Sequence, residues 1–333
     1  LKDDEDENEN ENESDDENEN EDVIYSTYER DFFENDSLGL INDQTIHFDP
    51  NDQLSNPSDI ANLVIQSNRI VCLSGAGISV ESGIPPFRVS STTAEKSKSS
   101  VSIWGEFDPN LMTVQGFNSN PEIAKEWWKM KHYLLPIIES AEPNSAHLFF
   151  SYLNSINKLH HIITQNIDSL HHRSGISNDK ILELHGHMRG VICSNNSSSK
   201  FNPIPSGDGT CTYVNQEKLD HSVECPKCPL CNSILRTESV LFGQPLVEDD
   251  FQQAIQSIMS ADLLFIIGSS LIVHPVNQFP LIAQKLGIPM IIINMDETSY
   301  DQYATGLIHQ PAGEFLQQVL SEIQLKLQLD LKL

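Results

Sequence analysis

Short, almost continuous apolar runs recur along the chain from residue 60 onward. The clearest of them are Ile70–Leu73, His161–Thr164, Leu263–Ile267 and Met290–Ile293, and each is followed by small or polar residues. Strands of a parallel sheet are covered on both faces and therefore show runs of this kind, whereas half-exposed strands alternate apolar and polar residues. The pattern predicts a set of buried parallel strands.

Amphipathic stretches lie between these runs and predict helices. They are Pro121–Glu139, Ser145–Asn157, Phe251–Met259 and Asn277–Leu286, preceded by a helical face at Ile60, Leu63, Val64 and Ser67. Strands that alternate with helices indicate an α/β fold with a doubly wound, Rossmann-like parallel sheet. Ligands of such sheets bind at the carboxyl ends of the strands, where the polar motifs of this chain fall.

The alternation stops between residues 190 and 236, a segment rich in Ser, Asn, Pro and Gly that holds five of the six cysteines. We therefore expect a small inserted module at 190–236 within a catalytic domain made of 59–189 and 237–322. The last stretch, 323–333, alternates leucine with polar residues, which favours a strand over a helix. It is treated as a C-terminal extension without an assigned function.

Residues 1–22 contain fourteen acids and one lysine, about half of the formal net charge of −28. Such a segment cannot bury apolar surface, so we predict a disordered acidic tail at 1–22 and a loosely ordered lead-in at 23–58. The acidic balance argues against binding to nucleic acid and favours a basic peptide as partner. No apolar run is long enough for a membrane span, and no secretory signal begins the chain. Clustered cysteines suggest metal ligands in a reducing, intracellular compartment.

Three motifs offer chemistry. Gly75-Ala76-Gly77 directly follows a predicted strand and could cradle a phosphate, although it lacks the third glycine of the common dinucleotide fingerprint. Asn166 and Asp168 stand at another strand exit, where they could face a pocket or cap the next helix. His185 follows an apolar strand, and a lone histidine there is either structural or a base that titrates near neutral pH.

Together these motifs resemble the signatures of the sirtuin family, in family order and spacing from about Ile60 to Leu320. The matching segments are Gly75-Ala76-Gly77-Ile78-Ser79, Ser82-Gly83-Ile84-Pro85, Phe87-Arg88, Thr164-Gln165-Asn166-Ile167-Asp168, Glu183-Leu184-His185-Gly186, Gly268-Ser269-Ser270-Leu271 and Ile293-Asn294. The resemblance implies an NAD-dependent protein-lysine deacetylase that converts acyl-lysine, NAD and water into lysine, nicotinamide and O-acyl-ADP-ribose.

The resemblance also implies roles for individual residues. His185 would be the general base, with Asn166 and Asp168 in the catalytic set. Asp168 would hold the nicotinamide carboxamide, Gln165 and Asn166 would contact ribose or an ordered water, and Phe87 would cover the nicotinamide pocket. The implied cofactor-binding residues are Gly75, Ala76, Gly77, Ile78, Ile84, Pro85, Phe87, Arg88, Gln165, Asn166, Ile167, Asp168, Gly268, Ser269, Ser270, Asn294 and Asp296. The implied substrate strand, which would pair with the backbone of an acetylated lysine-containing peptide, comprises Val240, Leu241, Phe242 and Gly243.

The cysteines resemble the two zinc pairs of the family, and a site of four thiolates would be structural because it leaves no open position for water. We expect Cys193, Cys211, Cys228 and Cys231 as ligands, with a low-complexity insertion at 194–210 inside the first pair. Cys225 remains a rival, since it forms a second C-x-x-C pair with Cys228.

Three positions depart from the family pattern. Pro86 stands where an aspartate is usual, Gln244 replaces a glutamate, and Ser269 replaces a threonine. Pro86 is the most serious change because it removes a backbone donor and a carboxylate from the cofactor loop. The Tyr and Arg of acidic-acyl-specific relatives are not seen, so acetyl is the expected acyl group. Protein ADP-ribosylation, a catalytically weak acyl-lysine-binding protein and, by fold analogy alone, a nicotinamide oxidoreductase stay open as alternatives.

Overall fold

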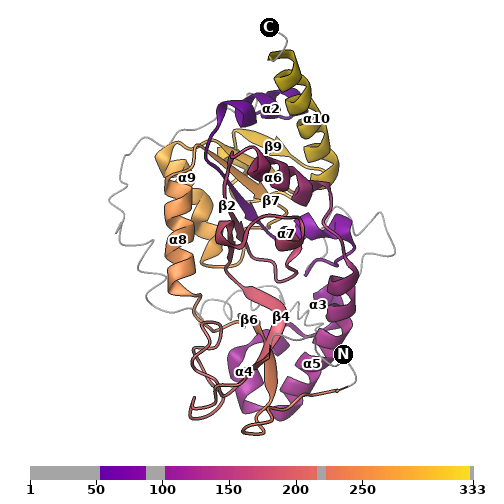
Figure 1. The fold of residues 1–333 in the computed structure, drawn as a ribbon, viewed down its shortest axis with the longest axis vertical. Helices are drawn as coiled ribbons and strands as arrows, with labels where there is room; N and C mark the ends of the chain where they lie inside the picture. Colours follow the sequence, from indigo (N-terminus) through magenta and orange to yellow (C-terminus); the bar gives the residue numbers. More distant parts are fainter. Residues whose placement is uncertain (1–52, 88–101, 216–222, 331–333) are drawn as a thin grey trace, which may run out of the picture.

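A computed structural model of the chain describes residues 53–87, 102–215 and 223–330 (Figure 1). The predicted acidic tail, most of the lead-in and Arg88 lie outside these described residues. Two lobes are visible in Figure 1, a larger one built on a parallel sheet and a smaller one below it that contains α3, α4, α5, β4 and β6.

The larger lobe contains a six-stranded parallel sheet in the order β3-β2-β1-β7-β8-β9. The strands are β1 (Ile70–Ser74), β2 (Leu159–Thr164), β3 (Ile181–Glu183), β7 (Leu263–Ile267), β8 (Met290–Ile293) and β9 (Gly306–Ile308). Each of the four predicted apolar runs is a strand, and every residue of β1, β7 and β8 is buried. The doubly wound α/β fold predicted from the sequence is thereby confirmed.

Helices cover both faces of this sheet. On one face α2 (Pro57–Gln66), α6 (Ser145–Ser155) and α10 (Ala312–Asp330) pack over an apolar cluster, and on the other α8 (Glu248–Met259) and α9 (Phe279–Leu286) cover a second one. Local signals set their starts. The side chain of Asn56 caps α2, and Asn144 forms a capping box with His147 at the start of α6.

The end of the chain differs from the sequence-based expectation. We predicted a strand at 323–333, but α10 is a single helix through Asp330. Its buried residues, Phe315, Leu316, Val319 and Ile323, recur at helical spacing and pack against α2 and α6. The helix therefore continues past Ile323 although leucines alternate there, and one of them, Leu325, is 54% exposed. The packing of these buried residues against α2 and α6 outweighs the local alternation of leucine and polar residues.

The smaller lobe joins an antiparallel sheet to a group of helices. Its strands are β4 (Gly186–Cys193), β5 (Val214–Asn215) and β6 (Leu235–Ser239), in the order β5-β4-β6. Its helices are α3 (Ile103–Glu106), α4 (Val114–Ser119) and α5 (Pro121–Ser140). They share one apolar core that includes Trp127, Trp128 and the buried cysteines. This sheet extends a few residues beyond the predicted module, 190–236, at both ends.

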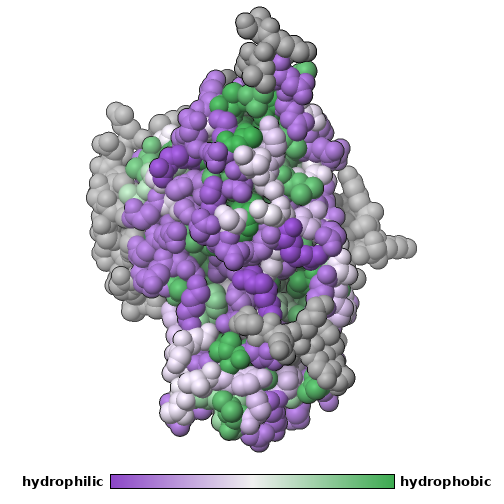
Figure 2. All heavy atoms as spheres, in the orientation of Figure 1, coloured by the Kyte–Doolittle hydropathy of each residue, from purple (hydrophilic) through white to green (hydrophobic). Residues whose placement is uncertain are grey.

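Short helical turns lie in the connections between these helices and strands. They are α7 (Leu170–Arg173) and the 3₁₀ helices η2 (Ala76–Ser82), η3 (Pro109–Met112), η4 (Asn178–Lys180), η5 (Val276–Gln278) and η6 (Asp301–Tyr303). Within the described ranges, none of the helices combines the length and apolar character needed to cross a membrane. On the face drawn in Figure 2, apolar side chains occupy separate spots on a largely hydrophilic surface.

Candidate active site

The glycine turn after β1 packs directly against the turn after β7. A Cβ added to Gly77 would lie 2.6 Å from the Cα of Gly268, and one added to Gly75 would lie 2.7 Å from the Gly268 carbonyl oxygen. Gly268 itself has φ +60°, and a Cβ there would lie 2.3 Å from the Ile78 nitrogen. These glycines are required because two backbone segments touch at this point.

This contact changes the interpretation of the glycine turn. The N–H of Gly75 donates to the carbonyl of Ile267 at 2.9 Å, and the N–H of Gly77 donates to that of Gly268 at 2.8 Å. The N–H groups of Gly75 and Gly77 are thus used within the protein, and the approach of backbone N–H groups of this turn to a pyrophosphate stays a prediction. The two turns are hydrogen-bonded to each other at the carboxyl ends of β1 and β7.

The exit of β2 is bonded to the glycine turn through Ser79. The Asn166 amide donates to the Gly75 carbonyl at 3.0 Å and to the Ser79 hydroxyl at 3.2 Å. The Ser79 hydroxyl in turn donates to a carboxylate oxygen of Asp168 at 2.7 Å. All three side chains are buried, with 7% or less of their surface exposed. The first two sequence motifs therefore meet in one hydrogen-bonded group.

His185 joins the same group from the end of β3. Its Nδ1 donates to the carbonyl oxygen of Gln165 at 3.1 Å. The side-chain amide of Gln165 donates to the hydroxyl of Ser269 at 2.9 Å, in the turn after β7. The carboxyl ends of β1, β2, β3 and β7 are thus connected by a continuous set of contacts. Sequence reasoning placed these motifs at strand ends, and the sheet order brings them together.

Burial shapes the protonation of the two titratable residues in this group. Burial lowers the pKa of His185 to about 4, even though its hydrogen bond to Gln165 acts in the opposite direction. Burial also raises the pKa of Asp168, opposed by hydrogen bonds from the Leu170 N–H and the Ser79 hydroxyl. The imidazole is therefore neutral at physiological pH and able to accept a proton.

Glu183, in the family-like Glu-Leu-His-Gly motif, anchors the loops around His185. Its carboxylate receives two hydrogen bonds of 2.6 Å from Arg189, and His172 Nε2 lies 3.1 Å away. Burial alone would raise its pKa, but His172 and Arg189 hold it down at about 2. Arg189 also donates to the Ser169 hydroxyl at 2.7 Å. The bidentate pair ties β4 to β3, and the bond to Ser169 ties β4 to the loop that carries Asp168.

Ser74, His171 and His147 form a further group of buried polar side chains, for which the sequence motifs suggested no role. The Ser74 hydroxyl lies 2.9 Å from His171 Nε2, and the ring of His171 lies 4.9 Å from that of His147. Both histidines are buried, and burial lowers both pKa values. Ser79 was also missed as a site residue. It stands inside the quoted glycine motif, which was the available signal.

The segment expected to pair with a substrate, 240–243, follows β6 and contains an isolated β-bridge between Phe242 and Thr113. Strand β6 ends at Ser239, and the N–H and C=O of Phe242 pair with Met112 and Val114. The N–H of Leu241 donates to the Gln244 side chain at 2.8 Å. The N–H and C=O of Phe242 are therefore paired within the smaller lobe, and the pairing of Val240, Leu241, Phe242 and Gly243 with a substrate backbone stays a prediction.

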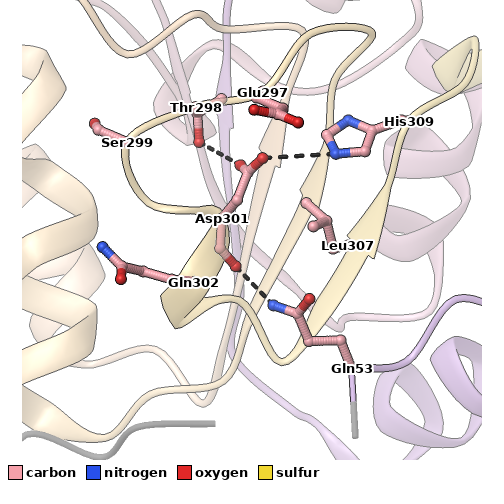
Figure 3. Close-up of a pocket in the computed structure, with 8 residues that line it drawn as sticks. All are labelled: Gln53, Glu297, Thr298, Ser299, Asp301, Gln302, Leu307 and His309. Atoms are coloured by element: carbon pink, nitrogen blue, oxygen red, sulfur yellow. Dashed lines mark hydrogen bonds and ion pairs between the residues drawn. The ribbon is translucent and has the colours of Figure 1, made fainter. Parts of the chain in front are cut away.

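The late motifs lie at the end of β8. The N–H of Asn294 bonds the Ile308 carbonyl at 3.1 Å, and its side chain bonds the Asp296 carbonyl at 2.9 Å. Ser270 is exposed, next to Ser269 in the turn after β7. Beside these loops is an open pocket of about 420 Å³ (Figure 3). Its lining includes Asp301 and His309, whose side chains lie 3.5 Å apart.

The remaining predicted cofactor residues also line this end of the sheet. Ile78 is buried in η2 and Ile84 follows it, while Phe87 and Ile167 are partly buried against the core of the smaller lobe. The carbonyl of Pro86 accepts a hydrogen bond of 3.0 Å from the Ile103 N–H at the start of α3. The segment through Pro85 and Phe87 therefore connects the cofactor side of the sheet to the smaller lobe.

Four cysteines form a compact cluster in the smaller lobe. The Sγ atoms of Cys193, Cys211, Cys228 and Cys231 all lie within 4.8 Å of one another, with a separation of 3.4 Å between Cys193 and Cys231. Four sulfurs bound at the usual Zn–S distance would be about 3.8 Å apart, so the cluster fits a structural zinc ion. These are the four ligands predicted from the sequence. Cys225 stands outside the cluster and is half-buried.

Comparisons with known proteins agree with this geometry. A model of the Sir2 family matches residues 75–275. The NAD-dependent protein deacetylase 1 of Pyrobaculum aerophilum is 34% identical over 267 residues, which cover 80% of this chain and 94% of that protein. The NAD-dependent protein deacylase of Pyrococcus abyssi is 30% identical, with 81% of this chain and 99% of that protein covered.

Solved structures of related proteins carry the ligands expected of such a site. A Sir2 structure with a deacetylated p53 peptide and 3′-O-acetyl ADP-ribose superposes with a TM-score of 0.68 at 30% identity, covering 80% of this chain and 98% of that one. A Sir2 homologue in complex with NAD has the same TM-score at 29% identity, with 84% and 98% covered. From its fold, its cysteine cluster and these relatives, the chain belongs to the Sir2 family of NAD-dependent protein deacetylases and deacylases.

Proposed function

We propose that this sirtuin removes acetyl groups from protein lysines, with NAD as co-substrate and His185 as the general base. The proposal rests above all on one observation at the carboxyl ends of β2 and β3: His185 bonds the Gln165 carbonyl, and the next residue, Asn166, is joined to Asp168 through the Ser79 hydroxyl. In such sheets this edge is where dinucleotides bind. Solved relatives with the same fold bind NAD, a p53 peptide together with NAD⁺, or a deacetylated p53 peptide together with 3′-O-acetyl ADP-ribose.

His185 is suited to take a proton from a ribose hydroxyl. Because Nδ1 donates to the Gln165 carbonyl, the neutral ring carries its free electron pair on Nε2. The carbonyl fixes both the tautomer and the direction of the ring. In the reaction, the acyl-lysine carbonyl oxygen bonds to the ribose carbon as nicotinamide leaves, and Nε2 accepts the hydroxyl proton when that hydroxyl attacks the acyl carbon.

Asp168 and Asn166 are proposed to orient the nicotinamide end of NAD. A buried carboxylate can accept hydrogen bonds from a carboxamide, and Ser79 and the Leu170 N–H hold this one in place. The Asn166 amide is fixed by the Gly75 carbonyl. Phe87, packed against the core of the smaller lobe, would cover the nicotinamide and exclude water from the reacting carbon.

The departures from the sirtuin pattern at Pro86 and Ser269 do not disrupt these contacts. Ser269 keeps a hydroxyl, which accepts the Gln165 amide. Pro86 lacks an N–H, but its carbonyl still holds α3 through Ile103. We expect Pro86 to affect the rate of reaction more than the binding of NAD, because the carboxylate of the usual aspartate is absent from the cofactor loop.

An acetylated lysine within a basic segment is the proposed substrate. The chain has 48 acidic against 20 basic residues, so a lysine-rich peptide would be attracted to it. In the segment 240–243, the N–H and C=O of Phe242 are already paired within the protein. A substrate backbone would therefore bind other backbone groups of this segment. A thiolate zinc site and six free cysteines favour a reducing intracellular compartment, either nucleus or cytoplasm.

The products separate this proposal from ADP-ribosyl transfer on the same scaffold. The full chain is incubated with an acetylated peptide and NAD labelled in the adenosine moiety. Deacetylation predicts label in free O-acetyl-ADP-ribose, in equal amount to the nicotinamide released. Label bound to protein would favour transfer, and tight binding of the acetylated peptide without nicotinamide release would favour a non-catalytic acyl-lysine reader.

A further inference from the structure

Two cations are enclosed in the smaller lobe, between α5 and β6. Lys131 and Arg236 both have 0% of their surface exposed. Besides burial, the positive charge of Arg236 lowers the pKa of Lys131, so the two side chains repel each other. Buried charges in proteins normally have a partner of opposite sign.

Neither cation is paired with a carboxylate among the described residues. Arg236 donates only to uncharged oxygens, namely the carbonyls of Phe201, Thr237 and Ser239 and the side chains of Asn202 and Gln244. Gln244 stands where the family resemblance leads us to expect a glutamate. The Lys131 ammonium lies over the ring of Trp127, 4.8 Å from the ring centre.

Three hydrogen-bond donors of α5 and of the segment after β6 have no acceptor. Lys131 Nζ, Trp127 Nε1 and Gln244 Nε2 are all buried and have no hydrogen-bond partner. Lys131 and Trp127 are one helical turn apart on the same face of α5. Gln244 has its oxygen already bonded to Arg236 and to the Leu241 N–H, which leaves its amide N–H₂ to face outward from that contact.

We infer that this cluster is a binding site for a small monovalent anion of the halide type, held by Lys131 Nζ next to the positive charge of Arg236. Such an ion supplies both the missing acceptor and the missing negative charge. Burial, reinforced by Arg236, lowers the pKa of Lys131 to about 7, so the ammonium form needs a counter-charge near neutral pH. Because Arg236 also binds Ser239 and Gln244, the anion would stabilise the segment 240–243.

The inference is tested on the full-length chain by thermal unfolding at constant ionic strength. Sodium bromide or chloride replaces sodium gluconate, whose anion is too large for a side-chain-sized site. The cluster predicts a saturable rise in Tm of about 3–5 °C with either halide. In crystals grown with bromide, anomalous density is expected beside Lys131 Nζ. Equal Tm in gluconate and halide would overturn the inference and leave Lys131 as a neutral amine.

Two substitutions and a control make the test specific. Lys131→Met should abolish the halide response, while Lys129→Met, which removes an exposed lysine of the same helix, should keep it. Gln244→Glu supplies a carboxylate to Arg236 and should weaken the response by at least half even if Lys131→Met does not fold. A full response in Lys131→Met or in Gln244→Glu would contradict the site.

Discussion

The Nδ1 atom of His185 lies 3.1 Å from the carbonyl oxygen of Gln165, the residue that opens the loop carrying Asn166 and Asp168. This contact links the expected base to the expected nicotinamide site through one peptide group. A shift of that loop would therefore turn the imidazole as well. The geometry of proton transfer and the geometry of cofactor binding are set by the same segment.

The acidity of His185 gives the first prediction. Its pKa of about 4 in the folded protein is lower than the ordinary 6.5, so the ring stays neutral and active into moderately acidic solution. We expect the acid limb of kcat/KM to lie well below pH 6.5, measured with NAD varied at saturating peptide and accompanied by an NMR titration of the His185 ring. A limb at 6.5 that follows the ring titration would show that the burial argument is incorrect.

The lowered pKa of His185 also predicts how the free energy of unfolding depends on pH. Between pH 6.5 and about 4, the unfolded histidine binds a proton that the folded one does not. The stability contributed by neutral His185 is therefore complete above 6.5 and is lost as the pH falls through this window. Unfolding free energies of wild type and His185→Gln, compared from pH 7 to 4, should converge at the acidic end.

Ser79 is the hydroxyl that joins the glycine turn to Asp168. Ser79→Ala leaves an oxygen of the buried Asp168 carboxylate without a partner, a loss of about 1–3 kcal/mol. If that loss falls on NAD binding and the transition state, kcat/KM for NAD drops about 10- to 100-fold. Ser82→Ala, at the other end of η2 and bonded to Asn144, is the control and should change kcat/KM less than threefold. Equal effects of the two variants would contradict the role of Ser79.

The contact between the two strand-end turns predicts a steric effect at Gly268. Gly268→Ala places a Cβ 2.3 Å from the backbone of Ile78, whereas Gly83→Ala, also at positive φ, meets no atom within 4 Å. Gly83→Ala should cost about 1 kcal/mol from backbone strain alone. Gly268→Ala should cost clearly more and should also weaken NAD binding, as measured by denaturant unfolding and calorimetry. Similar values for both would mean that the turns can separate freely.

The choice of zinc ligands can be tested by a pair of cysteine variants. Cys231→Ser removes a member of the four-sulfur cluster and should lose zinc, helical packing of the smaller lobe and deacetylation together. Cys225→Ser changes a half-buried thiol outside the cluster and should retain wild-type zinc content. Metal analysis after dialysis checks both. Zinc retained by Cys231→Ser but lost by Cys225→Ser would reverse the assignment.

Much of the fold could be predicted because buried parallel strands have an unambiguous pattern. The runs that form β1, β2, β7 and β8 are nearly all apolar, and these are the four inner strands of the sheet. Strand β9 has only three residues and sits at the edge of the sheet, where its pattern is too short to recognise. In α10 the leucine alternation suggested a strand, but long-range contacts with α2 and α6 decide the conformation.

The site was predicted in part, and the remainder depended on contacts between distant segments. Motif order was enough to select His185, Asn166 and Asp168. It could not show that the N–H groups of Gly75 and Gly77 are used against the β7 turn, nor that Phe242 pairs with Met112 and Val114. Backbone pairing between segments this far apart in the chain leaves no local pattern in the sequence, so those two assignments needed the fold.

The most direct test of the account is deacetylation of an acetylated peptide by the full chain with and without NAD, beside His185→Ala. We predict that the wild type releases nicotinamide and forms O-acetyl-ADP-ribose only when NAD is present. His185→Ala should remain folded and zinc-bound, and should lose about 10²- to 10⁴-fold in rate. Deacetylation that proceeds without NAD, or at the wild-type rate in His185→Ala, would contradict the central claim.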